Sequence, residues 1–211
     1  MLEVSDLSFG FRFRPIFAGV SFSLDSGQML HIQGPNGCGK TTLMSILAGL
    51  KQANSGSITF KQAHNALPED LRKHAEYLPA EANALYGKMD AMQNLKFWLN
   101  LRGHKAKEEV LTRALERWDL GHKLIRSQFP VEKFSTGMKR RLALARVELS
   151  NTRLWLLDEP LYGLDAKGIE TFQQAVKTHL ESGGSVLIVS HEVSALAMFH
   201  PQALLMPGKK G

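Results

Sequence analysis

The sequence predicts an α/β fold built on a mainly parallel β-sheet, and three features of the chain support this prediction. A short strand, Met29–Gln33, runs directly into a glycine-rich loop and then a helix. Two later strands, Leu154–Leu157 and Ser185–Val189, are short continuous apolar runs, as expected of central strands covered on both faces. A helix at about Ala166–Leu180 separates them, so strand and helix alternate as in parallel sheets.

The N-terminal segment predicts an antiparallel β subdomain. Apolar and polar residues alternate at residues 2–4 and again at 20–24, the pattern of half-buried strands. Asp25-Ser26-Gly27 predicts the turn that closes this pair of strands.

A helical subdomain is predicted as an insertion at about residues 80–145. Apolar residues between Leu95 and Trp118 recur with a period near 3.6 among many charges, and no heptad pattern is sustained. The chain has 211 residues, and domains commonly hold roughly 100–200. We therefore expect residues 1–211 to form a single domain that carries this insertion.

The composition is that of an ordinary globular protein with a moderate basic excess. Hydrophobic residues make up 44% and charged residues 22% of the chain, which disfavours disorder and coiled coils. The formal net charge of +6 is compatible with nucleic acid, an anionic membrane surface or a polyanionic ligand. Cys38 is the only cysteine, which excludes an internal disulfide and indicates a reducing, intracellular compartment.

The N-terminus and the hydropathy pattern give no sign of export or membrane insertion. Acidic residues stand at positions 3 and 6, where a secretory signal needs a basic region. No apolar run approaches the roughly 18 residues needed to span a bilayer. We expect a chain that does not cross a membrane by itself.

A phosphate-binding loop is the strongest local signal. The segment matches the pattern G-x-x-x-x-G-K-[ST] in full, with a strand before it and a helix after it. Its backbone N–H groups would surround phosphate oxygens, Lys40 would reach the β- and γ-phosphates, and the Thr41 hydroxyl would ligate Mg²⁺. The alternative is a glycine-rich turn that precedes a helix by chance. The residues of the pattern are Gly34, Pro35, Asn36, Gly37, Cys38, Gly39, Lys40 and Thr41.

Ionisable residues follow two of the predicted central strands. Asp158 and Glu159 stand at the carboxyl end of one strand, and His191 follows the other. Ligands of open α/β sheets bind at this edge. Asp158 suits a magnesium ligand, while Glu159 could orient or deprotonate an attacking water. The alternative is that these residues are solvated turn residues.

The stretch Phe134–Met138 predicts a second anion site at the start of a helix. Ser135 is a plausible N-cap, and free N–H groups at a helix N-terminus attract anions. The alternative is an ordinary capped helix with an exposed basic face. Its solvated charges would be those of Lys139, Arg140, Arg141 and Arg146.

Taken together, these segments resemble the ATP-binding subunit of an ABC transporter over nearly the whole chain. The resemblance rests on five motifs in the family's order: Walker A at 34–41, the signature-like 134–138, Walker B at 154–159, the D-loop-like 161–165 and the switch histidine His191. It implies a P-loop NTPase fold, ATP and Mg²⁺ as cofactors, and catalytic roles for Lys40, Glu159 and His191. It also implies that Thr42 joins the nucleotide site. In the implied head-to-tail homodimer, Ser135 and Gly137 of one subunit close over ATP held by the other.

Two further positions follow from the same resemblance. An aromatic residue from the N-terminal strands should stack on adenine, and the family pattern places it at Phe11, with Phe9 and Phe13 as rivals. The family also carries a glutamine that touches Mg²⁺ before the helical insertion, and no glutamine stands there in this chain. Counting forward from Pro79 places the family position at Ala80, whereas counting backward from Asn94 places it at Glu81. Ala80 offers Mg²⁺ no donor, whereas Glu81 offers a hard oxygen donor of similar length, so we expect Glu81 to replace the glutamine as a metal ligand.

The leading functional hypothesis is a transport motor in which ATP hydrolysis drives a separate integral membrane permease. The resemblance then implies a peripheral protein at the cytoplasmic face of the cell membrane, with no nucleic acid partner. The short chain is similar to the haem-exporter subunit of cytochrome c maturation, although drug, polysaccharide and lipid exporters are alternatives. A soluble ABC-type ATPase acting in iron–sulfur cluster assembly or on nucleic acid is a second hypothesis. A small P-loop phosphotransferase is a third.

Overall fold

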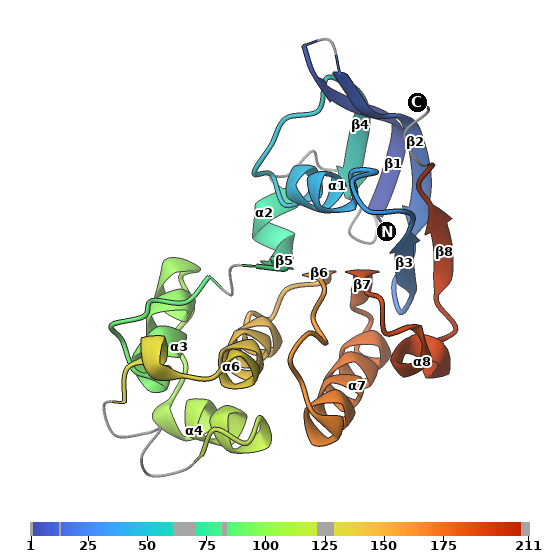
Figure 1. Ribbon diagram of the computed structural model, residues 1–211. Coiled ribbons are helices and arrows are strands. Elements are labelled where there is room, and N and C mark those ends of the chain that lie inside the picture. The colour runs from blue at the N-terminus through green and yellow to red at the C-terminus, as the bar shows by residue number, and fades with distance from the viewer. Residues whose placement is uncertain (1, 13, 61–70, 82–83, 122–128, 208–211) are drawn as a thin grey trace. The chain divides into compact units, whose positions relative to one another are not determined.

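The computed structural model describes all residues except 1, 13, 61–70, 82–83, 122–128 and 208–211. Figure 1 shows its helices and strands. The chain divides into two compact units, which are described separately. The first unit comprises Met1–Tyr77, Thr152–Glu159 and Lys177–Gly211, and the second comprises Leu78–Asn151 and Pro160–Val176.

An antiparallel three-stranded sheet forms one layer of the first unit, as the sequence predicted. Its strands are β1 (Leu2–Phe11), β2 (Arg14–Leu24) and β4 (Ser55–Phe60), in the order β2-β1-β4. A turn is present at residues 25–27, but the prediction that it closes this pair of strands was wrong, because it leads from β2 into β3 of the other sheet. Alternation alone marks a half-buried strand and does not show which strand it pairs with.

A five-stranded sheet carries the residues that follow the predicted central strands. The pairs β6–β7, β7–β3 and β3–β8 are parallel, which confirms the predicted sheet type. All residues of β6 and β7 are buried, as their continuous apolar sequences require. The strand order is β5 (Ala75–Leu78), β6 (Leu154–Asp158), β7 (Ser185–Val189), β3 (Met29–Gln33) and β8 (Gln202–Leu205).

Helix α1 (Lys40–Leu47) lies between the two sheets of the first unit (Figure 1). Its side chains Leu43, Met44 and Leu47 are fully buried, and they share one apolar core with residues of both sheets. Burial of this core holds the start of α1 in a fixed position beside the carboxyl end of β3. The short elements α2 (Leu71–His74), α8 (Val193–Leu196) and η2 (Ala197–Phe199) also occur in this unit.

The helices expected in the middle of the chain are present in the second unit. Helix α3 begins at a capping box, in which the Asp90 carboxylate accepts from the Gln93 backbone N–H at 2.7 Å and the Gln93 side chain bonds back to Asp90 N–H. The helices of this segment are α3 (Ala91–Leu101), α4 (Glu108–Arg117), η1 (Val131–Lys133) and α6 (Thr136–Leu149). Helix α7 (Ala166–Glu181) is divided between the units at Val176.

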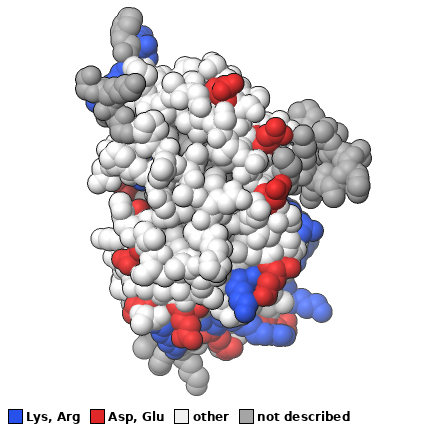
Figure 2. Space-filling view, turned by 90° about the vertical axis from the view of Figure 1, so that its right-hand side faces the viewer, with Lys and Arg blue, Asp and Glu red and all other residues white. Residues whose placement is uncertain are grey.

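Basic and acidic side chains both occur on the face of the molecule shown in Figure 2. On the face shown in Figure 2, the described lysines and arginines lie among acidic residues rather than in one broad basic patch. Ion pairs of the helical unit follow the same pattern, such as Lys96 with Glu108 at 3.0 Å and Arg117 with Glu148 at 2.7 Å. This face therefore shows no broad basic patch among the described residues.

Candidate nucleotide-binding site

The glycine-rich loop between β3 and α1 has a backbone that depends on glycine. Gly34, Gly37 and Gly39 have φ angles of +149°, +79° and +105°. A Cβ atom on Gly39 would lie 2.6 Å from Cγ2 of Ile16, so a larger residue would collide with β2. The loop can take this course only with glycine at such positions.

Lys40 is the first residue of α1, and its side chain turns back over the loop. Its Nζ donates to the carbonyl oxygens of Gly34 at 2.7 Å and Pro35 at 3.3 Å. The N-cap residue Gly39 provides no side-chain cap, and no acidic residue lies in the first turn. The free N–H groups of this turn and the ammonium group of Lys40 therefore make the N-terminus of α1 attractive to anions. Thr41 and Thr42, which carry hydroxyl groups, are the next two residues of the helix.

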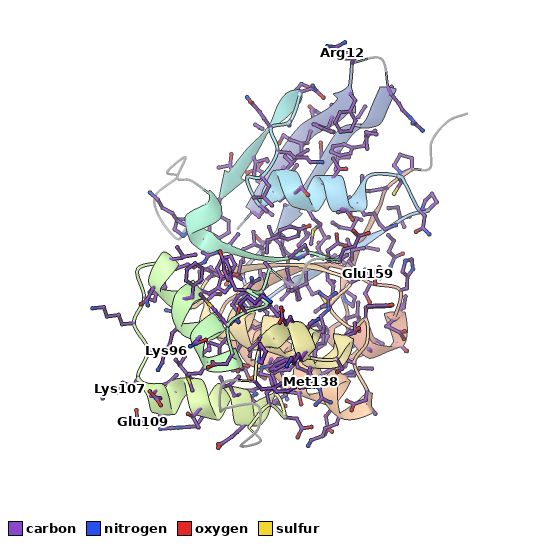
Figure 3. All side chains as sticks on the ribbon, turned by 60° about the vertical axis from the view of Figure 1, so that its left-hand side comes forward. Arg12, Lys96, Lys107, Glu109, Met138 and Glu159 are labelled. Carbon is purple, nitrogen blue, oxygen red and sulfur yellow. The ribbon has the colours of Figure 1, made fainter. Side chains whose placement is uncertain are left out.

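Glu159 directly follows β6 (Figure 3) and is fixed against the neighbouring strand β7. Its backbone N–H donates to the carbonyl of Val189 at 2.8 Å. Its Oε1 lies 3.4 Å from Nε2 of His191, and its Oε2 accepts from the backbone N–H of His191 at 3.3 Å. The fold thus brings together the carboxylate and the imidazole that the sequence placed at two separate strand ends.

A cavity of about 200 Å³ joins these groups to the phosphate loop. Lys40 comes from the loop, whereas Glu159 and His191 come from the ends of β6 and β7, so a ligand in the cavity meets all three. Its lining residues are His31, Ile32, Gln33, Gly34, Lys40, Glu159, Val189, Ser190, His191 and Val193.

Asp158 ends β6 as a buried carboxylate, 1% exposed. The pKa of Tyr77 on β5 is raised to about 12, mainly by burial and secondly by the negative charge of Asp158. A hydrogen bond with Ser45 acts in the opposite direction and lowers this pKa. Ser45 belongs to α1, so its hydrogen bond with Tyr77 joins this helix to β5. Within α1, Ser45 also donates to the carbonyl of Thr41 at 2.8 Å.

The donor atoms of Thr41 and Asp158 fit magnesium. A hydroxyl and a carboxylate are hard oxygen donors, and Mg²⁺ usually binds through one or two carboxylates together with substrate phosphates and waters. Within the described part of the chain, no group of three or more His, Cys, Asp or Glu residues could hold a metal. Such a sparse donor set suits a metal ion that arrives with a nucleotide.

The aromatic candidates for adenine stacking differ in exposure. Phe11 is 58% exposed and contacts Phe9 edge to face, with 5.2 Å between ring centroids. Phe9 packs against the apolar core of the unit. Phe13 lies outside the described residues. The ammonium group of Lys51 lies 5.8 Å from the centroid of the Phe11 ring. Of the two described rings, Phe11 is the more exposed one.

The second predicted anion site is a capped helix start in the other unit. Ser135 is the N-cap of α6, and its hydroxyl accepts from the N–H of Met138 at 3.2 Å (Figure 3). A Cβ atom on Gly137 would lie 2.6 Å from the carbonyl oxygen of Gly163. Any side chain at position 137 therefore disturbs the D-loop-like segment of the same subunit.

The alternative of an exposed basic face on α6 is wrong for three of its four residues. Arg140, Arg141 and Arg146 are 2%, 9% and 3% exposed. Arg141 binds the carboxylates of Asp119 at 2.8 Å and Asp165 at 2.6 Å, which explains how its charge is buried. Sequence alone favours exposure for arginine, because buried charge needs partners that only the fold supplies.

Arg140 and Arg146 bind backbone carbonyls of the segment where the family glutamine is missing. Arg140 donates to the carbonyls of Pro79, at 3.1 Å, and Ala80. Arg146 donates to the carbonyl of Ala84 at 3.1 Å. Glu81 is exposed and belongs to the same unit as these arginines, so its role as a metal ligand stays a prediction.

Sequence reasoning missed two polar residues of the cavity, His31 and Gln33. Both were treated as part of a strand, yet both line the cavity beside Lys40 and Glu159. The available signal was their spacing, since residues two apart share one face of a strand.

In the described part of the chain, no helix has the length and apolar character needed to cross a bilayer. The fold and the phosphate loop define a P-loop NTPase. The family model described as "ABC transporter" matches residues 17–162. The chain belongs to this family, and it is an ATP-binding, ATP-hydrolysing subunit of an ABC transporter.

Relatives and solved structures agree with this assignment. The chain is 34% identical over 193 residues to the "Cytochrome c biogenesis ATP-binding export protein CcmA" of Tatumella citrea, covering 91% of this chain and 89% of the relative. The protein of the same name from Bordetella bronchiseptica is 38% identical over 174 residues, covering 82% and 75%. An ATP-binding subunit of an ABC transporter has a TM-score of 0.84 at 26% identity, covering 98% and 85%. A putative ABC transporter ATP-binding protein from Pyrococcus furiosus has a TM-score of 0.79 at 25% identity, covering 97% and 96%.

Proposed function

We propose that the chain powers an exporter for cytochrome c biogenesis, with haem as the exported solute. The similarity to relatives named as export proteins of cytochrome c biogenesis supports this substrate class. The same names favour transport over the alternative of a soluble ATPase acting in iron–sulfur cluster assembly or on nucleic acid.

The arrangement of Lys40, Glu159 and His191 around one cavity carries the proposed chemistry. Lys40 leaves the carbonyls of Gly34 and Pro35 and binds the β- and γ-phosphates of ATP. Glu159 orients the attacking water and accepts its proton, while Nε2 and the backbone N–H of His191 hold the carboxylate.

Other residues of the site bind the nucleotide and its metal. The residues of the loop at 34–42 surround the phosphates, and Phe11 stacks on adenine through its exposed face. Thr41 and Asp158, with Glu81 as a third donor, would hold Mg²⁺, which when bound supplies charge neutralisation at the phosphates.

The assembly we propose is a head-to-tail homodimer bound to an integral membrane permease. In it, Ser135 and Gly137 close over ATP held by the partner subunit, because the capped start of α6 presents N–H groups and no acidic residue. The protein then lies peripherally on the cytoplasmic face of the cell membrane. We also propose that both compact units belong to one nucleotide-binding domain, residues 1–211.

Glu159→Gln tests the chemistry. The amide keeps the shape of the side chain but cannot accept the proton, so ATP should still bind while turnover falls by roughly 10²- to 10⁴-fold. The trapped ATP state should elute as a dimer in size-exclusion chromatography. Glu170→Gln removes an exposed carboxylate from α7 and serves as the matched control. Hydrolysis by Glu159→Gln at the parent rate would move the role of the base to another residue.

An experiment in cells tests the identity of the exported solute separately from the ATPase chemistry. Deleting the gene should abolish covalently bound haem in c-type cytochromes, detected by haem staining of gels, and Glu159→Gln should fail to restore it. Normal c-type cytochromes in the deletion strain would reject cytochrome c biogenesis while leaving the ATPase assignment intact.

A further inference from the structure

His31 and Gln33 are two polar residues of β3, a central strand of the five-stranded sheet. Strand β3 lies between β7 and β8, and its residues from Met29 to Ile32 are buried. His31 is only 2% exposed. Burying an imidazole in a strand core is unfavourable unless its nitrogens are hydrogen-bonded, so the partners of this ring show what it does.

Both ring nitrogens of His31 have partners. Gln33 Nε2 lies 3.0 Å from His31 Nδ1, and His31 Nε2 lies 3.0 Å from the carbonyl oxygen of Ser190. A backbone carbonyl oxygen can only accept, so the ring proton stands on Nε2 and His31 donates to Ser190. The Gln33 amide pairs with the other ring nitrogen, Nδ1, and so orients the ring.

The carbonyl of Ser190 belongs to the same peptide unit as the N–H of His191. That N–H donates to Glu159 Oε2 at 3.3 Å. Because a peptide unit is planar and rigid, fixing its carbonyl also fixes the direction of its N–H. On the following residue, the N–H of Glu192 donates to Ser190 Oγ at 3.1 Å, which holds this turn from a second side.

We propose that His31 is a positioning residue for ATP hydrolysis. Through the Ser190–His191 peptide it holds the Glu159 carboxylate and the His191 side chain toward the cavity, and Gln33 orients the imidazole by pairing with Nδ1. The inference rests on the proposed roles of Glu159 and His191. It assigns a role to residues of β3, the strand that also leads into the phosphate loop. One strand therefore positions Lys40 on one side of the cavity and Glu159 with His191 on the other.

The kinetic test compares two replacements of His31. His31→Asn cannot place a donor at the position of Nε2, so kcat should fall roughly ten- to a hundredfold while KM for ATP stays within about twofold. His31→Gln carries an amide N–H at about the reach of Nε2 and should recover most of the rate. A parent kcat in His31→Asn would overturn the proposal, and so would an equal loss in both variants.

His179 provides a matched control in the same unit. It is also buried, and its Nε2 also bonds a carbonyl of β7, that of Ser185 at 3.3 Å, but at the other end of the strand. His179→Asn should lower the melting temperature without changing kcat of the folded enzyme. A loss of kcat equal to that of His31→Asn would show that any buried histidine bonded to a carbonyl of β7 has this effect, and would reject a positioning role.

A spectroscopic test does not depend on activity. Nitrogen-15 NMR of the imidazole should show the proton of His31 on Nε2, and a proton on Nδ1 would contradict the proposal. Should His31→Asn fail to fold, Gln33→Met keeps the histidine and a similar side-chain shape but removes the donor to Nδ1. In Gln33→Met the Ser190 carbonyl still requires the proton on Nε2, but the ring loses the contact that orients it, so we expect a lower kcat with the same tautomer. An unchanged kcat would overturn the proposal.

The failures of the two proposals are distinguishable. If Glu159→Gln and His191→Ala both hydrolyse ATP at the parent rate, the proposed catalytic site is wrong whatever His31 does. If both are inactive while His31→Asn retains the parent kcat, only the positioning role of His31 is rejected.

Discussion

Acid should destabilise the protein through His179, a buried imidazole remote from the proposed chemistry. The His179 ring stacks on Trp155 with 3.9 Å between centroids and 9° between planes. Burial, opposed in part by its bond to Ser185, lowers the pKa of His179 to about 4 from the ordinary 6.5. A Cβ atom on Gly184 would lie 2.2 Å from the ring, so the imidazole fills the space that this glycine leaves.

The size of the effect follows from the difference in pKa between the folded and unfolded states. Because the folded pKa is the lower one, the unfolded chain takes up the proton first as the pH falls. The contribution to stability is complete above pH 6.5 and is lost progressively as the pH falls toward 4. At about 1.36 kcal/mol per pKa unit, the full loss is about 3 kcal/mol.

Urea unfolding between pH 7.5 and 4.5 measures this loss. His179→Gln cannot titrate, so the free energy of unfolding of the parent should fall by about 2–3 kcal/mol more than that of the variant over this range. The comparison uses the difference between the two pH profiles, so the lost stacking on Trp155, which is independent of pH, cancels. Parallel profiles would refute the argument, as would an NMR titration that places the folded pKa of His179 near 6.5.

Two further predictions concern nucleotide binding. Lys40→Ala should abolish tight Mg·ATP binding in calorimetry, because the loop loses the charge that faces the β- and γ-phosphates, and unchanged affinity would reject the loop assignment. Glu81→Ala should leave ATP affinity similar or slightly tighter but lower Mg²⁺-dependent hydrolysis, and Glu81→Gln should be tolerated. Parent turnover in Glu81→Ala, alone and with the membrane partner, would make Glu81 a solvated loop acid.

The sheet that carries the site could be predicted because its strands are locally recognisable. Met29–Gln33 is identified by the loop that follows it, and β6 and β7 by their continuous apolar residues. Strands β4, β5 and β8 were missed. The sequences of β4 and β8 have weaker patterns, and these strands owe their structure to pairing with β1 and β3. Strand β5 has only four residues, too few to show a clear pattern.

Some residues of the candidate site could be predicted from the sequence, and others could not. Lys40, Glu159 and His191 could be placed together from sequence, because the carboxyl ends of parallel strands meet at one edge of a sheet. The partners of His31 could not, because Ser190 lies 159 residues away and its role depends on the direction of one carbonyl. Local sequence patterns indicate which residues lie at the carboxyl edge of the sheet. The residues that hold them in position depend on contacts between segments far apart in the sequence, so local patterns do not reveal them.

The arginines of α6 bear on how the missing glutamine should be interpreted. Arg140 binds the carbonyls of Pro79 and Ala80, so the backbone that leads into Glu81 is held by a buried guanidinium from the helix that follows the signature-like segment. Arg146 binds Ala84 and lies 4.5 Å from the ring centroid of Trp98. Since these bonds are made to backbone atoms on both sides of Glu81, replacing its side chain leaves them intact. The turnover of Glu81→Ala therefore measures the carboxylate itself rather than the fold of the segment that carries it.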